Sequence, residues 1–162
     1  VVPVDTARVY FFGHSNGAFM AMHMACTHAD RITAIGTLAG TEAVDFTCTT
    51  LARPVSVLHL HGTADTTIQY GGGTVGAASF VGAEAVVSRW ASRDGCDATG
   101  TPGTAFDWDT VVAGAEATPN VFGGCDGGAS VELWTLTGSG HIPVTNGLGM
   151  RSIIDWLLAR RS

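Results

Sequence analysis

Short apolar runs alternate along the chain with stretches whose apolar residues recur at helical spacing. The runs at residues 8–12, 32–38, 55–60 and 131–137 predict buried strands, and the run at 55–60 is the most strand-like. Residues 18–28, 77–90 and 153–161 have helical spacing, the last with Ile153, Ile154, Leu157 and Leu158 on one face. Residues 71–73 are expected to form a plain turn, and residues 94–128 to hold only a short strand or hairpin.

Strand and helix patterns in alternation predict an α/β fold, a parallel sheet with helices on its faces. The chain has 162 residues, of which 46% are hydrophobic and 14% charged. That composition fits one domain, residues 1–162, with a sizeable core.

Charge and apolar run length exclude two classes of partner. The net charge is -6, with eight Arg and no Lys, so the chain lacks the basic patch that binds nucleic acid. No apolar stretch approaches the roughly 20 residues needed to cross a bilayer, so we expect no membrane span. The start also lacks the pattern of a signal peptide, so any export signal is expected outside this sequence.

The candidate chemistry begins with Gly13-His14-Ser15-Asn16-Gly17, a G-x-S-x-G sequence between a predicted strand and a predicted helix. In this context the glycines permit a tight turn that exposes the serine as a nucleophile. The backbone N–H of Asn16 would then donate to an oxyanion, and His14 would shape the pocket. The alternative is a Gly-rich turn with Ser15 as an ordinary helix N-cap.

A serine nucleophile needs a base and an acid, in the chain order Ser, Asp or Glu, His. Asp65 follows the predicted strand 55–60, and His141 follows the predicted strand 131–137. The carboxyl ends of parallel strands meet at one sheet edge, so both residues are expected beside Ser15. Taken singly, Asp65 could instead be an Asx-turn residue and His141 a solvated loop histidine.

A metal site is the competing interpretation of the remaining histidines. His59 and His61 share one face of a predicted strand, but no third ligand has convincing spacing, so a structural role is favoured. No metal or organic cofactor is expected.

These residues resemble the polyhydroxybutyrate depolymerase-like esterases, secreted α/β-hydrolases that include feruloyl-esterase-like and acetyl-xylan-esterase-like members. The resemblance covers nearly the whole chain. Its landmarks are Arg8-Val9-Tyr10, Ser15-Asn16-Gly17, the block from Leu58 to Asp65, Arg93-Asp94-Gly95-Cys96, Val131-Glu132-Leu133-Trp134 and Gly140-His141. It implies a three-layer α/β-hydrolase fold and the triad of Ser15, Asp65 and His141. Gly17-Ala18 and Ile142-Pro143 depart from the family pattern at the pocket wall, which affects substrate preference and makes Ile142 a pocket candidate.

The resemblance also implies that the chain holds only the C-terminal four parallel strands, starting at the nucleophile strand. The second oxyanion donor of the family comes from a loop after an earlier strand. The strand at residues 8–12, bounded by Arg8 and Phe12, would then be an unpaired edge. We therefore expect a fragment, a cleaved product or a homodimer that pairs through this edge.

Four cysteines can pair in three ways. Strand polarity places Cys26 with Cys48, and Cys96 with Cys125, at the edge opposite the active site, and the family supports the second pair. Four reduced thiols are the alternative. Disulfides would indicate a secreted or periplasmic protein.

The expected function is ester hydrolysis through an acyl-enzyme, on a small soluble substrate. The resemblance implies short-chain or hydroxycinnamoyl esters. One alternative is a weak or inactive hydrolase fragment that serves as a binding or oligomerising module. Another is an acyltransferase with the same triad, in which an alcohol outcompetes water.

Overall fold

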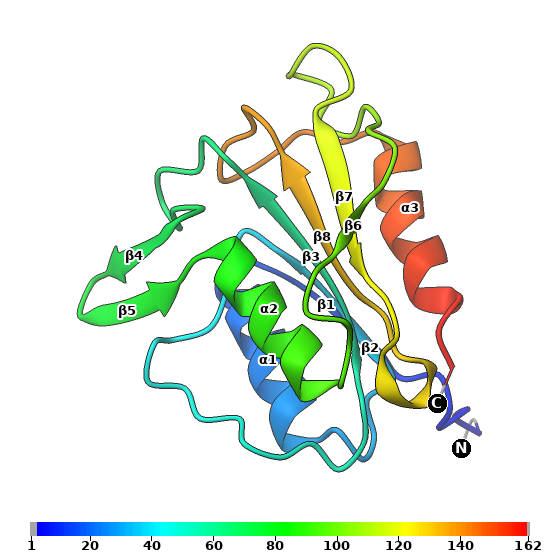
Figure 1. The fold of residues 1–162 in the computed structure, drawn as a ribbon. Helices are drawn as coiled ribbons and strands as arrows, with labels where there is room; N and C mark the ends of the chain where they lie inside the picture. Colours follow the sequence, from blue (N-terminus) through cyan, green and yellow to red (C-terminus); the bar gives the residue numbers. More distant parts are fainter. Residues whose placement is uncertain (1–2, 162) are drawn as a thin grey trace.

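The computed structural model describes residues 3–161, and its centre is a mixed sheet of six strands (Figure 1). In chain order the elements are β1 Tyr10–His14, α1 Asn16–Thr27, β2 Ala34–Leu38, β3 Ser56–Gly62, β4 Gly72–Val75, β5 Ala78–Val81, α2 Ala83–Arg93, β6 Thr101–Pro102, β7 Ala117–Phe122, the 3₁₀ turn η1 Asp126–Gly128, β8 Val131–Leu136 and α3 Gly147–Leu158. The strand order in the sheet is β1-β2-β3-β8-β7-β6.

The four strands that the apolar runs predict are all present and form the parallel part of the sheet. β1 pairs with β2, β2 with β3, and β3 with β8, each in parallel. Their carboxyl ends therefore lie at one edge of the sheet, from which the following loops start. Strands β7 and β6 extend the sheet beyond β8 in antiparallel orientation, from the region where a short strand or hairpin is predicted.

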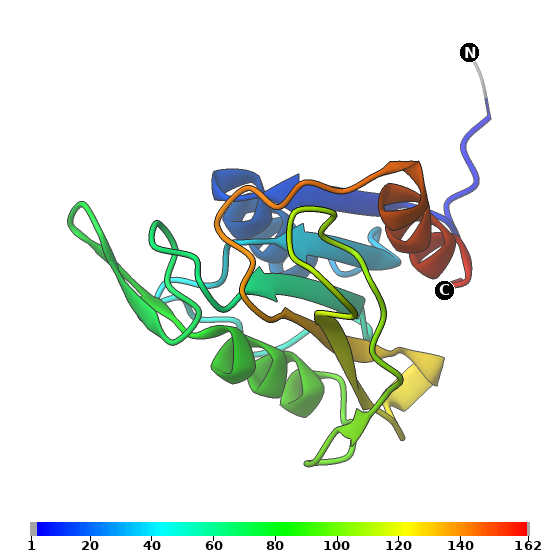
Figure 2. The ribbon, with the colours of Figure 1, turned by 90° about the horizontal axis from the view of Figure 1, so that it is seen from above.

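Helices cover both faces of the sheet, with α1 and α2 on one face and α3 on the other (Figure 2). Alternation along β3 supplies both cores: Val57 packs in the cluster that includes Met22 of α1 and Trp90 of α2. Leu58 and Leu60 pack in the opposite cluster, with α3. β2 and β3 are buried along their whole length, which explains why they are continuous apolar runs, whereas the edge strand β1 leaves Phe11 and Phe12 exposed.

Two local predictions are wrong. The segment 77–90 is not one helix, because Ala78–Val81 is strand β5, and residues 71–73 are not a plain turn, because β4 starts at Gly72. The two strands form an antiparallel hairpin outside the main sheet. The hairpin is fixed by the loop after β2, where the Val44 N–H donates to the Ser79 carbonyl and the Val81 N–H to the Glu42 carbonyl. A contact with a distant segment thus overrides local helical spacing.

The closing helix begins earlier than predicted, at Gly147, because the Asn146 side chain caps it and accepts from the Leu148 and Gly149 N–H groups. Ile153 and Leu157 are buried as expected. Ile154 and Leu158 are exposed, at 46% and 52%, so the predicted apolar face is partly wrong.

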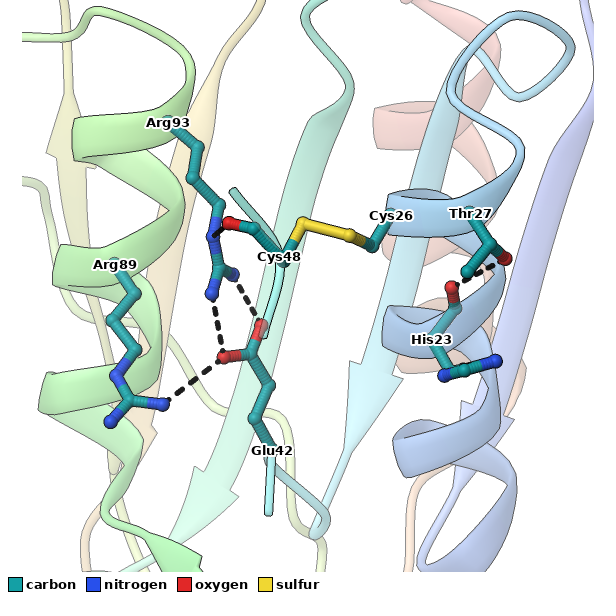
Figure 3. Close-up of a disulfide and its surroundings, with 7 residues drawn as sticks. All are labelled: His23, Cys26, Thr27, Glu42, Cys48, Arg89 and Arg93. Carbon is teal, nitrogen blue, oxygen red and sulfur yellow. Dashed lines mark hydrogen bonds and ion pairs between the residues drawn. A yellow bond between two sulfur atoms is a disulfide. The ribbon is translucent and has the colours of Figure 1, made fainter. Parts of the chain in front are cut away.

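Both predicted disulfides, Cys26–Cys48 and Cys96–Cys125, are present. Cys26–Cys48 joins α1 to the loop after β2 (Figure 3). Beside it, the buried Glu42 carboxylate forms a bidentate pair with Arg93 of α2, and the Arg93 Nε–H donates to the Cys48 carbonyl at 3.2 Å. The loop is therefore attached to both helices on this face.

Across residues 3–161, no helix has the length and apolar character required to cross a bilayer.

Candidate active site

Ser15 lies on a sharp turn between β1 and α1. Its backbone has φ 55° and ψ -121°, in a region that residues other than glycine rarely adopt. Its side chain makes no capping hydrogen bond to the helix, so it does not act as the N-cap that the alternative interpretation requires. A strained turn of this kind exposes a serine hydroxyl above the carboxyl end of a strand.

The two glycines of the motif do not have equal roles. A Cβ at Gly13 would lie 2.1 Å from the Gly17 carbonyl oxygen, so the tight turn requires glycine there. A Cβ at Gly17 would meet no atom within 4 Å. A third glycine, Gly40 after β2, approaches the turn from outside, because a Cβ there would lie 2.3 Å from the Ser15 carbonyl oxygen.

Asp65 lies in the loop after β3 and its side chain is buried. Its Oδ1 accepts hydrogen bonds from the Thr67 and Ile68 backbone N–H groups, at 2.8 and 2.9 Å. These bonds fix the carboxylate and leave Oδ2 directed at His141. Asp65 is therefore both an Asx-turn residue, through Oδ1, and the partner of His141, through Oδ2.

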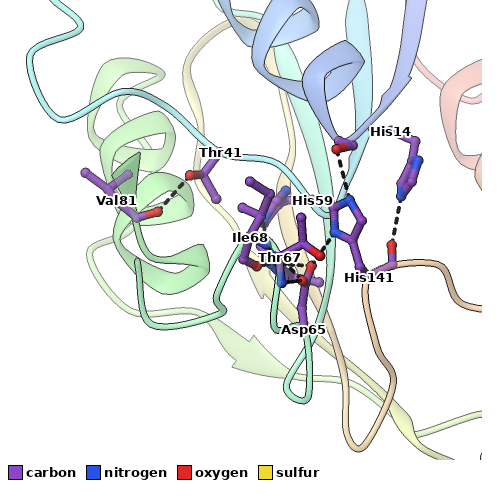
Figure 4. Close-up of polar contacts among 10 residues, drawn as sticks. His14, Thr41, His59, Asp65, Thr67, Ile68, Val81 and His141 are labelled. Atoms are coloured by element: carbon purple, nitrogen blue, oxygen red, sulfur yellow. Dashed lines mark hydrogen bonds and ion pairs between the residues drawn. The ribbon is translucent and has the colours of Figure 1, made fainter. Parts of the chain in front are cut away.

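His141 lies in the loop after β8, and Figure 4 shows it beside Asp65. Its Nδ1 is 2.8 Å from Asp65 Oδ2, and its Nε2 is 2.9 Å from Ser15 Oγ. A carboxylate can only accept, so Nδ1 carries the proton and Nε2 is free to accept from the serine hydroxyl. The structure brings together the three residues that the sequence analysis selects, and their catalytic role stays a prediction.

The other candidates lie near this group in different ways. His14 donates from Nε2 to the His141 backbone carbonyl at 2.8 Å, so it supports the loop that carries His141 (Figure 4). Asn16 is the first residue of α1, where backbone N–H groups have no partner inside the helix. Ile142 is 76% exposed.

A cavity of about 410 Å³ opens beside Ser15. Its lining comes from the Ser15 turn, α1, the loops after β2 and β3, and the β4–β5 hairpin: Ser15, Asn16, Phe19, Ala43, Thr67, Ile68, Val75, Ala78, Ser79 and Phe80. His14 and Ile142 are not among these residues. The hairpin wall is not predicted from the sequence, because the helical spacing of residues 77–90 hides strand β5. The sequence of Ala78–Val81 shows no alternation of apolar and polar residues, so no local signal marked Phe80, the one buried residue of β5, as part of this wall.

His59 and His61 are buried on the α1 and α2 side of β3, in contact with each other and not with solvent. Burial holds the pKa of His59 well below its ordinary value, and the neighbouring His61 adds to this. Burial also lowers the pKa of His61. The hydrogen bond to the Ile68 carbonyl and the Asp65 carboxylate act in the opposite direction and raise it. Within residues 3–161, no three His, Cys, Asp or Glu side chains are grouped to hold a metal ion.

Comparison with known proteins gives one family and two relatives. A family model described as phospholipase/carboxylesterase matches residues 2–80, which include Ser15 and Asp65. Feruloyl esterase B of Piromyces equi is 34% identical over 146 residues, which are 85% of this chain and 25% of that protein. A bifunctional acetylxylan esterase/xylanase of Neocallimastix patriciarum is 26% identical over 140 residues, 86% of this chain and 19% of that protein. The chain thus spans a quarter or less of the length of these relatives.

Proposed function

The chain belongs to the esterase family of the α/β-hydrolase fold, and from that premise we propose that it hydrolyses carboxylic esters through an acyl-enzyme on Ser15. The observation that carries the proposal is the position of His141 between Ser15 Oγ and Asp65 Oδ2. This arrangement is that of a nucleophile, its base and the acid that orients the base.

The proposed reaction starts with transfer of the Ser15 hydroxyl proton to His141 Nε2 while Ser15 Oγ bonds to the ester carbonyl carbon. Asp65 holds the ring through Nδ1 and stabilises the imidazolium that forms. The proton on Nε2 then passes to the leaving alcohol as the carbon–oxygen bond breaks. Water attacks the acyl-enzyme by the same steps, with His141 as base, and releases the acid and free Ser15.

The negative charge that develops on the carbonyl oxygen needs a hydrogen-bond donor. Asn16 supplies its backbone N–H at the start of α1, where the helix dipole also favours negative charge.

The cavity supports an acyl group with an apolar body. Phe19 and Phe80 both line it and pack edge to face, with ring centroids 6.2 Å apart. A volume of about 410 Å³ accommodates either a short acyl chain or one aromatic ring with its side chain. Together with the feruloyl and acetylxylan esterase relatives, this supports short-chain or hydroxycinnamoyl esters as the substrate class.

The substrate class is tested by comparing p-nitrophenyl acetate, p-nitrophenyl butyrate and methyl ferulate for wild type and Phe80→Ala. We expect Phe80→Ala to lower kcat/KM for the larger acyl groups by about tenfold and to leave acetate within about threefold, because burial of one ring is worth about 1.5–3 kcal/mol. Equal losses on all three esters would contradict an acyl site in this cavity.

The sheet edge supports a second proposal, a binding or oligomerising role. β1 lies at the end of the strand order, and Phe11 and Phe12 are 37% and 41% exposed. Pairing of two chains through this edge would bury both rings. Light scattering after size exclusion tests it, and a monomer at all concentrations would contradict pairing.

The two disulfides support an extracellular location, since such bonds persist in oxidising compartments. Localisation of a tagged full-length protein in its source organism tests this.

A further inference from the structure

His61 lies beside Asp65 and takes no part in the proposed reaction. Its Nε2 is 2.7 Å from the Ile68 carbonyl oxygen and 3.5 Å from Asp65 Oδ2. A carbonyl can only accept, so Nε2 carries a proton and donates to Ile68. The Ile68 N–H in turn donates to Asp65 Oδ1 at 2.9 Å. His61 therefore fixes Ile68, whose N–H fixes the Asp65 carboxylate. Figure 4 shows His59, Ile68 and Asp65 grouped beside His141.

The proton on Nε2 of His61 determines which ring nitrogen of His59 is protonated and where the Thr37 hydroxyl donates. In a neutral His61 the Nδ1 atom must accept, and it lies 3.1 Å from Nε2 of His59, which must then donate. Nδ1 of a neutral His59 accepts in turn, and the Thr37 hydroxyl lies 2.9 Å from it as donor, closer than the Leu58 carbonyl at 3.3 Å, the other acceptor for the same hydrogen. The parallel register makes this possible, because Thr37 of β2 is the direct partner of His59 of β3.

The surroundings keep both rings neutral. His59 and His61 are fully buried, which disfavours an imidazolium in either position. Besides His59, the titratable groups that face His61 are Asp65, His141 and Tyr70. The Tyr70 ring packs edge-on at 5.7 Å, and its hydroxyl is held by Thr135. A cationic His61 would lie 3.5 Å from Asp65 Oδ2, the same oxygen that receives His141. A neutral His61 leaves that oxygen to His141.

We propose that Thr37, His59 and His61 form a neutral hydrogen-bonded chain that fixes the Asp65 carboxylate toward His141. Both histidines are positioning residues, since neither touches the reacting atoms. The inference rests on the proposed function for its effect on rate, whereas the arrangement of the protons in the chain can be measured without any turnover.

The first test is nitrogen-15 NMR of the ring nitrogens in protein labelled at histidine, at pH 7. The expected spectrum shows both His59 and His61 neutral, with Nε2 protonated and Nδ1 unprotonated. A proton on Nδ1 of His61, or on both of its nitrogens, would overturn the proposal.

The second test is substitution of His61, with Leu60→Ala as the matched control. Leu60 is an adjacent buried residue of β3 that packs on the opposite face of the sheet. His61→Leu is expected to lower kcat about 10- to 100-fold with KM within about twofold, because the acid loses its orientation while the ester site is untouched. His61→Gln, whose amide can donate to Ile68, is expected to recover most of kcat. Leu60→Ala should lower stability and leave kcat near wild type.

A third readout separates failure of this inference from failure of the proposed function. The deshielded Nδ1 proton of His141, bonded to Asp65, is expected to shift in His61→Leu and to stay in place in Leu60→Ala. Wild-type protein without turnover would contradict the esterase, while this resonance would still decide the inference. An unchanged resonance, or equal loss of kcat in His61→Leu and Leu60→Ala, would overturn it.

If His61→Leu does not fold, Thr37→Val carries the same test, because it removes only the hydroxyl that ends the chain. Altered His59 ring-nitrogen shifts with a lower kcat are then expected. Unchanged shifts and unchanged kcat would overturn the proposal.

Discussion

Gly62, the last residue of β3, lies directly against the backbone of Ser139 in the loop after β8: a Cβ at Gly62 would be 2.2 Å from the Ser139 carbonyl oxygen. This close approach puts the loop of Asp65 beside the loop of His141. The distance of 2.8 Å between Asp65 Oδ2 and His141 Nδ1 therefore depends on a missing side chain.

Gly62→Ala is expected to push the two loops apart and to lower kcat by about 100-fold or more, because a displacement of about 1 Å at a catalytic group costs about that much. Gly140→Ala is the control, since a Cβ there would meet no atom within 4 Å. Steady-state kinetics on folded protein of both variants makes the comparison. Similar rates for both variants would show that the close approach does not hold the pair in place.

Gly13→Ala and Gly17→Ala test the turn that carries Ser15. Gly13→Ala is expected to destabilise the fold by about 3 kcal/mol or more, because its Cβ would overlap backbone atoms. Gly17→Ala should be neutral or stabilising by up to about 1 kcal/mol, since alanine favours the helix and meets no neighbour there. Urea unfolding measures both, and a large loss at Gly17 would contradict the geometry.

Asp65→Asn is expected to lower kcat by about 10⁴-fold with little change in the free energy of unfolding. The amide keeps the shape of the side chain but cannot stabilise the imidazolium, and it allows the wrong tautomer of His141. Stopped assays with a p-nitrophenyl ester, together with thermal melts, give both quantities. A variant within tenfold of wild type would remove Asp65 from the proposed reaction.

Asp94, at the end of α2, predicts a pH dependence of stability. Its Oδ1 accepts from the Val55 N–H at 3.2 Å, while its buried Oδ2 has no partner among residues 3–161. Burial raises the pKa of Asp94 to about 7. Since the unfolded pKa is about 3.9, the folded state binds more protons between these values, so stability falls as pH rises from about 4 to about 7 and then levels off.

Asp94→Asn should abolish this pH dependence. The gain in the free energy of unfolding over wild type should be larger at pH 8 than at pH 4.5, by an amount on the order of a few kcal/mol at most. Urea unfolding at the two pH values measures it. Parallel pH profiles for variant and wild type would show that Asp94 is not the group responsible.

The parallel strands and the three clustered residues could be predicted because each depends on a local signal. Continuous apolar runs mark strands buried on both faces, and residues that follow such strands must meet at one edge. The same rule predicts that Ser15, Asp65 and His141 lie together at that edge.

The hairpin and the histidine chain could not be predicted in the same way, because distant segments decide them. Residues 78–81 are a strand because the loop after β2 pairs with them, whereas their own spacing favours a helix. The shared face of His59 and His61 was visible in the sequence. The register that places Thr37 beside His59 was not.

The most direct test of the account is hydrolysis of p-nitrophenyl acetate and butyrate by the 162-residue chain beside its Ser15→Ala variant. A Ser15 nucleophile predicts turnover in wild type that falls by about 10⁴-fold or more in the variant, because the nucleophile is removed. Equal rates in the two proteins would contradict it and would leave Ser15, Asp65 and His141 as a grouping without catalytic use in this chain.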